Sequence, residues 1–294
     1  MRVATRGSAL ALWQARHVAA LLRAAHPGLE VVEVIVETAG DRNRSVPIAE
    51  IGGRGVFTKE VQAAVLDGRA DLAVHSAKDL PSSPERQPHG LVIGAVPERG
   101  DPRDAMVGST LDAIPPGGTV GTGSVRRRAQ LADRRPDLTF AELRGNIGTR
   151  LDKAAGFDAV VVAVAALQRL EREDAIAEVL EPTVMLPQVG QGALAIECRP
   201  ESLDLVRAID HGPSRRCVDA ERSWLATLGG GCDLPAGAFC TIDSGGSLRL
   251  RAVLCTYDGR IVLRDENDGD GEALATRMLD NGGRSLLDDA GIGP

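Results

Sequence analysis

The chain has 294 residues, and its 34 lysines and arginines against 41 aspartates and glutamates give a formal net charge of −7. Apolar residues make up 43% of the sequence, which is typical of a globular chain of two or three domains and not of a disordered one. This balance argues against a dedicated nucleic-acid binder, and the longest apolar run, nine residues at 159–167, is too short to span a bilayer.

The polar N-terminal residues give no signal-peptide core, and five scattered cysteines form neither CxxC pairs nor a disulfide framework. We therefore expect a cytoplasmic protein without a nucleic-acid or membrane partner. The five histidines show no metal-ligand spacing, so no metal site is predicted.

Apolar periodicity predicts alternating helices and strands over the first two-thirds of the chain. Expected helices cover 9–25, 56–66, 124–134 and the stretch from 147, and expected strands cover 29–36, 72–75, 119–121, 139–143 and 159–163. Strands separated by such helices indicate parallel sheets with crossover helices. Proline-bracketed linkers are expected at 97–102 and 181–187.

The pattern changes after about residue 214. A helical segment with Trp224 leads to the glycine run 229–231, and three strands are expected at 238–242, 248–255 and 261–265, with a final helix after 272. This pattern predicts a separate small α+β unit after about residue 214.

The densest cationic segment, 121–128, lies where a strand gives way to a helix. Such a turn directs backbone N–H groups and a helix N-terminus at a ligand, and the guanidinium forks of Arg126 and Arg127 match carboxylate or phosphate oxygens in pairs. The segment fits neither the P-loop nor the GxGxxG spacing. The alternative is a solvated first helical turn capped by Ser124.

A second turn with the same composition, 143–150, follows the next strand and carries Arg144 and Arg150. Turns on successive parallel strands meet at the carboxyl edge of the sheet, where ligands of α/β proteins bind. Together with Arg6 after the first strand, they predict a cleft for a substrate with several carboxylates.

Lys78 and Asp79 follow the buried strand at 72–75 and are expected at such an edge. A carboxylate beside a cation stays ionised and can stabilise developing positive charge. A local Lys–Asp pair at a strand end is the alternative, and His75 is expected to be a packed core histidine.

Cys232 differs from the other cysteines because it follows three glycines in a loop. A loop thiol is a candidate nucleophile or attachment point, although an incidental surface cysteine has the same sequence signature.

In this order, the segments 4–14, 52–57, 74–79, 122–128, 143–150, 189–199 and 230–232 resemble the porphobilinogen deaminase family of tetrapyrrole biosynthesis. The resemblance covers nearly the whole chain and thins after about residue 236. It implies a transferase that joins four porphobilinogens head to tail, releasing ammonia and the linear hydroxymethylbilane. It also implies a dipyrromethane cofactor, attached by a thioether to Cys232.

The resemblance also implies roles for individual residues. Asp79 is the expected catalytic carboxylate, which hydrogen-bonds pyrrole N–H groups and stabilises positive charge as ammonia leaves. The expected partners of the cofactor carboxylates are Lys78, Thr122, Ser124, Arg126, Arg127 and Arg150. The expected substrate contacts are Arg6, Ser8, Gln14, Arg144, Arg150, Arg169 and Gln191, and a lid at 41–57 carries Arg54 and Phe57.

The implied fold is α/β, with two periplasmic-binding-protein-like α/β domains, a cleft between them, and a small C-terminal α+β domain. Domain 1 is expected at 1–96 and 188–212, domain 2 at 100–184, and domain 3, with the attachment cysteine, at 213–294. We expect a monomer.

Three positions depart from the family pattern. Gly123 replaces a frequent serine, and Arg54 a frequent lysine. Asp233 stands where an amide is frequent, and a carboxylate beside Cys232 raises the thiol pKa and slows thiolate formation. The competing hypotheses are a binding protein with the same cleft, which needs neither Cys232 nor Asp79, a catalytically dead relative, and an anion-binding regulator of nucleic acid.

Overall fold

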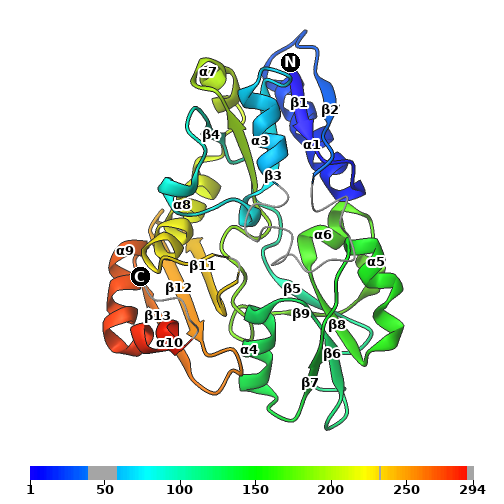
Figure 1. Ribbon diagram of the computed structural model, residues 1–294, viewed down its shortest axis with the longest axis vertical. Coiled ribbons are helices and arrows are strands. Elements are labelled where there is room, and N and C mark those ends of the chain that lie inside the picture. Colours follow the sequence, from blue (N-terminus) through cyan, green and yellow to red (C-terminus); the bar gives the residue numbers. More distant parts are fainter. Residues whose placement is uncertain (39–57, 232, 290–294) are drawn as a thin grey trace. The chain divides into compact units, whose positions relative to one another are not determined.

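The computed structural model describes residues 1–38, 58–231 and 233–289. The chain divides into two compact units (Figure 1). Unit 1 comprises residues 1–100 and 193–216, and unit 2 comprises residues 101–192 and 217–294.

Unit 1 is built on a five-stranded mixed sheet. Its strand order is β2 (Val32–Ile35), β1 (Arg2–Thr5), β3 (Leu72–Ser76), β10 (Leu194–Cys198) and β4 (Val92–Ala95). The first three strands are parallel, whereas β10 runs antiparallel to both of its neighbours. Residues 101–192 of unit 2 precede β10 in the chain, so no crossover helix of unit 1 leads into this strand, and it runs antiparallel to β3.

Helices cover both faces of this sheet, as strand alternation requires. Val3, Leu72 and Val74 pack in one cluster with α1 (Ala9–Ala25) and with Val206 of α7 (Leu203–Arg207). The alternate residues Ala4 and Ala73 pack with α3 (Lys59–Leu66).

The first sheet of unit 2 is also mixed. Its order is β7 (Thr139–Ala141), β6 (Thr119–Gly121), β8 (Ala159–Ala163), β5 (Asp104–Val107) and β9 (Ile176–Leu180). The strands β7, β6 and β8 are parallel, and each is followed by a helix: α5 (Ile147–Asp152), α4 (Val125–Arg134) and α6 (Val164–Arg169). The strand β5 is antiparallel to β8, so its first residue, Asp104, lies opposite Ala163 at the carboxyl end of β8.

The C-terminal part of unit 2 is an antiparallel sheet of β11 (Ala236–Ile242), β12 (Leu248–Cys255) and β13 (Val262–Asn267). It is packed with α8 (Gly212–Thr227, in unit 2 from Cys217), α9 (Gly271–Met278) and α10 (Arg284–Asp289). One core cluster surrounds the fully buried Trp224. A second joins Val253 and Cys255 of β12 to Ala129 of α4, so the small sheet packs on the helix that carries Arg126 and Arg127.

The predicted α/β class with a small C-terminal α+β part is confirmed. The predicted parallel pairing is confirmed for β1, β2 and β3 and for β6, β7 and β8, whereas β5 and β10, which were not predicted, run antiparallel to their neighbours. Short strands at β4, β5, β9 and β10 were not predicted. The division into three domains stays a prediction.

Candidate active site

The turn between β6 and α4 is organised by two hydroxyl groups. Ser124 is the N-cap of α4, and its Oγ accepts from the Arg127 backbone N–H at 3.4 Å. Thr122 Oγ1 accepts from the Ser124 N–H at 3.2 Å. A hydroxyl that accepts one hydrogen bond retains its own O–H donor. Both predicted cofactor partners therefore shape the turn and can still donate to a carboxylate.

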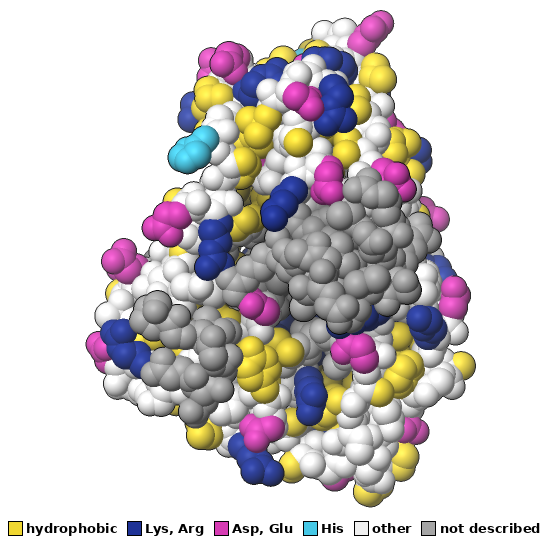
Figure 2. Space-filling model, in the orientation of Figure 1, with side chains coloured by type: hydrophobic (Ala, Val, Ile, Leu, Met, Phe, Trp, Pro, Cys, Tyr) yellow, Lys and Arg dark blue, Asp and Glu magenta, His cyan; other side chains and the backbone are white. Residues whose placement is uncertain are grey.

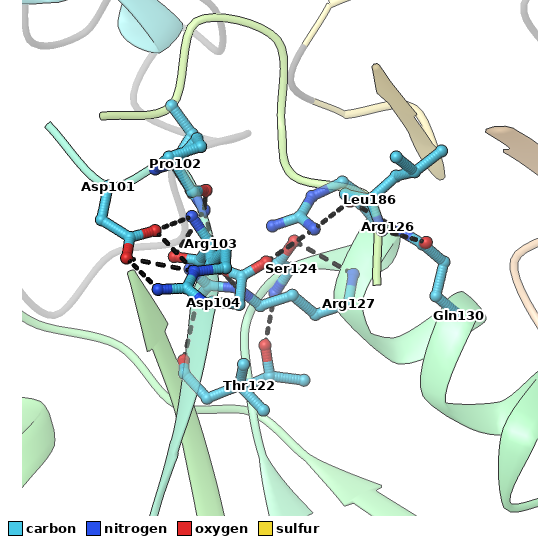
Figure 3. Close-up of polar contacts among 12 residues, drawn as sticks. Asp101, Pro102, Arg103, Asp104, Thr122, Ser124, Arg126, Arg127, Gln130 and Leu186 are labelled. Carbon is cyan, nitrogen blue, oxygen red and sulfur yellow. Dashed lines mark hydrogen bonds and ion pairs between the residues drawn. The ribbon is translucent and has the colours of Figure 1, made fainter. Parts of the chain in front are cut away.

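Arg126 and Arg127 are buried, not solvated, and share one carboxylate (Figure 3). Arg127 donates to Asp104 Oδ1 from Nε at 3.1 Å and from Nη2 at 2.8 Å, and from Nη1 to the Val161 carbonyl at 2.8 Å. Arg126 Nη1 lies 2.8 Å from Asp104 Oδ2. The three side chains together carry one net positive charge.

Asp104 is ionised in this setting. Burial alone would raise its pKa, but the charges of Arg126 and Arg127, with their hydrogen bonds, hold the pKa of Asp104 well below its ordinary value. Burial lowers the pKa of Arg126 against the opposing charge of Asp104. A buried pair of cations with a single anion is a suitable environment for another carboxylate.

The segment that returns from β9 completes the surroundings of the cluster. The Leu186 carbonyl accepts from Arg126 Nη1 at 2.7 Å and from Gln130 Nε2 at 3.0 Å (Figure 3). Gln191, fully buried, donates from Nε2 to the Pro102 carbonyl at 2.7 Å and to Asp104 Oδ1 at 2.9 Å. The substrate contact predicted for Gln191 stays a prediction, and its observed partners are within the protein.

A buried glutamate fixes the same segment from the C-terminal part. Glu221 of α8 is fully buried and accepts from the Gly190 N–H at 2.8 Å and from the Cys240 N–H at 2.9 Å. Sequence reasoning did not identify this residue, because a glutamate within an amphipathic helix is usually solvated.

Arg126 fits a ligand that carries carboxylates. Its Nε is buried and finds no hydrogen-bond acceptor within residues 1–38, 58–231 and 233–289. A buried donor without a partner costs free energy, and a ligand carboxylate removes that cost by accepting from Nε.

The second predicted turn follows β7, the parallel neighbour of β6, so it lies at the same sheet edge. Arg144 is exposed and donates from Nε to Glu142 at 2.6 Å. Arg150 is half-buried on α5 and donates from Nε to the Gly145 carbonyl at 2.8 Å, while Gly145 has a φ of +120° that favours glycine.

Arg169 ends α6, the helix that follows β8. Its Nη2 donates to the Gly192 carbonyl at 2.6 Å. Burial lowers the pKa of Arg169 to about 10, so the side chain remains cationic at neutral pH. The arginines at 126, 127, 144, 150 and 169 thus follow three adjacent parallel strands of one sheet.

In unit 1, the predicted residues cluster after β1 and β3. Ser8 caps α1 and accepts from the Ala11 N–H at 3.3 Å, and Arg6 is half-buried just before it. Gln14 is buried, and its Nε2 donates to Ser76 Oγ, at the end of β3, at 2.9 Å. Gln14 therefore supports the backbone that leads to the Lys78–Asp79 turn.

Lys78 and Asp79 lie in the 3-10 turn Ala77–Asp79, which follows β3 directly. Asp79 is exposed and Lys78 is half-buried, so the carboxylate is accessible to a ligand. Because β1 and β3 are parallel neighbours, this turn and Arg6 belong to the same sheet edge.

One residue before Ser76, a buried polar group backs this edge. His75 is a core histidine, as predicted, and its Nε2 lies 3.1 Å from Glu197 Oε2 on β10. The same oxygen accepts from Gln62 Nε2 of α3 at 2.8 Å. Glu197, like Asp104, is a carboxylate in an otherwise apolar strand, which was the available sequence signal for both.

Cys232, Arg54, Phe57 and the predicted lid at 41–57 lie outside the described residues. The other four cysteines, at 198, 217, 240 and 255, are buried, and no disulfide joins them to one another in the described structure. Burial raises the pKa of the Cys198 thiol to about 11 and that of the Cys255 thiol to about 12, so both are poor nucleophiles at neutral pH.

Figure 2 shows basic and acidic side chains interspersed on the face that it draws. In the described part of the chain, no three His, Cys, Asp or Glu side chains lie close enough together to hold a metal ion. Among the described residues, no helix combines the length and apolarity needed to cross a membrane.

The fold is that of an α/β protein, and its buried arginine pair has the charge and the donors that suit a carboxylate-bearing ligand. The model of the family described as "Porphobilinogen deaminase, dipyromethane cofactor binding domain" matches residues 1–207, and that of "Porphobilinogen deaminase, C-terminal domain" matches residues 215–280. The chain therefore belongs to the porphobilinogen deaminase family. It is a transferase that converts porphobilinogen to hydroxymethylbilane with a dipyrromethane cofactor.

Solved structures with some similarity are distant. The methionine-binding protein MetQ is 12% identical, with 76% of this chain and 89% of that chain covered and a TM-score of 0.44. An ABC transporter from Parabacteroides distasonis is 13% identical, with 71% and 69% covered and a TM-score of 0.42. These likenesses are too slight to carry an argument, and the family assignment rests on the two family models.

Proposed function

We propose that the chain joins four porphobilinogens head to tail, and that the two arginine-bearing turns of unit 2 and the Lys78–Asp79 turn of unit 1 carry residues needed for this reaction. The observation that carries this proposal is the buried cluster of Arg126, Arg127 and Asp104, which has one net positive charge and a buried Nε without an acceptor among the described residues. Each pyrrole of the substrate carries an acetate and a propionate, so the ligand supplies the matching oxygens.

Arg126 and Arg127, with Lys78, Thr122 and Ser124, hold the cofactor carboxylates in this proposal. The two hydroxyl groups keep their donors after capping the turn, and the turn leads into the N-terminus of α4, whose dipole favours anions. When bound, the dipyrromethane supplies the pyrrole carbon at which the chain is extended.

Gly123 matches this arrangement. A Cβ added there would lie 2.9 Å from the Glu142 carboxylate oxygen and 3.1 Å from the Leu143 carbonyl. The serine that is frequent in the family would require Glu142, the partner of Arg144, to move. The loss of one hydroxyl at this turn is therefore coupled to the position of Glu142.

The proposed catalytic carboxylate is Asp79. It accepts from the pyrrole N–H and stabilises positive charge on the pyrrole while the carbon–nitrogen bond to ammonia breaks. Its exposure leaves the carboxylate accessible to the substrate. Arg6, Ser8, Gln14, Arg144, Arg150, Arg169 and Gln191 are the proposed contacts to substrate and elongating chain, with Arg54 and Phe57 on a lid.

We propose that Cys232 holds the cofactor by a thioether. The burial of the other four cysteines supports this choice. Intact mass tests it: wild type should carry a two-pyrrole adduct, Cys232→Ser should carry none, and the matched control Cys217→Ser should carry as much as wild type. Equal adduct in wild type and Cys232→Ser would refute the attachment.

A second experiment separates an enzyme from a binding protein. Asp79→Asn should keep the fold and the adduct but lose most turnover, about 10²- to 10³-fold in kcat, as expected for removal of a transition-state charge partner. Asp67→Asn, an exposed aspartate of the same unit, is the control and should turn over normally. Near-normal kcat in Asp79→Asn would show that its assigned role is wrong.

We further propose that the chain is a cytoplasmic monomer with domains at 1–96 with 188–212, 100–184 and 213–294. The three separate sheets support three domains. Light scattering during size-exclusion chromatography tests the oligomeric state, and a mass twice that of the 30.8 kDa chain would refute a monomer.

A further inference from the structure

Asp104 is the residue on which the arginine cluster converges. It is the first residue of β5, opposite Ala163, and therefore lies at the edge where β6 and β8 end. Its side chain is fully buried. A carboxylate enclosed in this way is retained only where several donors hold it, because burial of an isolated charge is costly.

The two oxygens of Asp104 have different partners. Oδ1 accepts three hydrogen bonds, from Arg127 Nε, Arg127 Nη2 and Gln191 Nε2, at 3.1, 2.8 and 2.9 Å. Oδ2 has the ion pair to Arg126 Nη1 at 2.8 Å but no hydrogen bond of good geometry among the described residues.

This asymmetry divides the two arginines. Arg127 is fixed by its fork to Asp104 and by its bond to the Val161 carbonyl. Arg126 is located by the Leu186 carbonyl and the charge of Asp104, and its buried Nε is left without an acceptor in the described ranges. The guanidinium of Arg127 is thus hydrogen-bonded within the protein through three nitrogens, whereas Arg126 keeps its Nε as a donor for a ligand.

We infer that Asp104 is a positioning residue for cofactor loading: anchored by Gln191, it locks Arg127 and turns Arg126 so that its remaining donors meet a ligand carboxylate. The inference rests on the proposed function, because it takes that ligand to be the dipyrromethane. Asp104 acts through the arginines and does not itself meet the ligand, since like charges repel.

Two replacements of Asp104 separate the effect of its charge from the effect of its position. Asp104→Asn removes the counter-charge but keeps an oxygen acceptor of the same size, whereas Asp104→Glu keeps the charge and displaces it by one methylene group. If orientation matters, both variants load slowly, since displacement of a positioned group by about 1 Å can cost up to ~100-fold in rate.

The matched control is Asp101→Asn. Asp101 also forms a bidentate pair with an arginine, Arg103, three residues before Asp104, but it contacts neither Arg126 nor Arg127 in the described structure (Figure 3). Its replacement removes a carboxylate–guanidinium pair from the same segment and leaves the cluster intact.

The experiment follows adduct formation in time. Protein produced without its cofactor is given porphobilinogen, and intact mass reports the adduct per folded molecule, with the folded fraction taken from near-UV circular dichroism. Loading of Asp104→Asn and Asp104→Glu should be about 10- to 100-fold slower than that of wild type. Loading of Asp101→Asn should lie within about twofold of wild type.

Wild-type loading by Asp104→Asn would overturn the inference, and wild-type loading by Asp104→Glu would show that charge alone suffices, which also overturns it. If Asp104→Asn does not fold, Asp104→Glu decides, because it keeps the charge and displaces it by one methylene group; slow loading supports the role and wild-type loading refutes it. Absence of an adduct on wild type would instead refute the proposed function.

Discussion

Replacing Gly237 by alanine would push on the backbone that locates Arg126. Gly237 is the second residue of β11, and a Cβ there would lie 2.8 Å from both the Leu186 and Pro187 carbonyl oxygens and 3.2 Å from Arg126 Cδ. The Leu186 carbonyl is the acceptor for Arg126 Nη1 and for Gln130 Nε2. The added methyl group therefore contacts both the acceptor and the side chain that it orients.

The magnitude follows from this geometry. Ordinary contact begins at 3.4 Å, so the 186–187 backbone must move by about 0.6 Å. Overpacking of this kind costs about 1–3 kcal/mol. At about 2–4 °C per kcal/mol for a unit of this size, we expect the melting temperature of unit 2 to fall by about 2–12 °C.

Differential scanning calorimetry measures the melting temperature, and intact mass measures the adduct content of the same samples. Gly156→Ala is the matched control, since a Cβ there meets no described atom within 4 Å. It should melt at or slightly above wild type, with full adduct. If Gly237→Ala melts and loads like Gly156→Ala, the close approach of β11 to the Arg126 acceptor is not significant.

Three further outcomes are expected. Arg144→Ala removes an exposed ion pair with Glu142 and should change the unfolding free energy by at most about 1 kcal/mol. It should nevertheless lower kcat/KM about 10- to 100-fold, and an unchanged kcat/KM would exclude a substrate contact. The pKa of Asp104 is lowered on folding, so its contribution to stability is full above the ordinary aspartate pKa of about 3.9 and is lost progressively as the pH falls from about 5 to below that pKa. The unfolding free energy from urea titrations should therefore fall less steeply at acid pH for Asp104→Asn than for wild type, and equal slopes would contradict this. Because burial raises the pKa of the Cys198 and Cys255 thiols to about 11 and about 12, iodoacetamide at pH 8 should leave both unmodified in the native protein, as read by peptide mass, and rapid alkylation of either would refute their burial.

Local signals were sufficient to predict much of the architecture. The helix predicted at 9–25 is α1, and the strand predicted at 159–163 is β8, because both have strong periodic or continuous apolar patterns. The turn at Ser124 was predictable for a similar reason, since glycines, a capping residue and arginines follow one another within a few positions.

The remaining features depend on contacts distant in sequence. Asp104 lies 23 positions before Arg127, and only the antiparallel register of β5 brings them together. Nothing in the pattern of residues 194–198 distinguishes an antiparallel strand from a parallel one, since all five residues are buried. The roles of Asp79 and Cys232 came from family resemblance, not from spacing.

The position of β10 has a consequence for how the chain folds during synthesis. In the described sheet, β10 lies between β3 and β4 and pairs with both. Residues 194–198 emerge from the ribosome roughly one hundred residues after β4, which takes about 5–20 s at ordinary translation rates. Until then the first sheet lacks an internal strand, so residues 101–192 are fully synthesised before the N-terminal sheet can close.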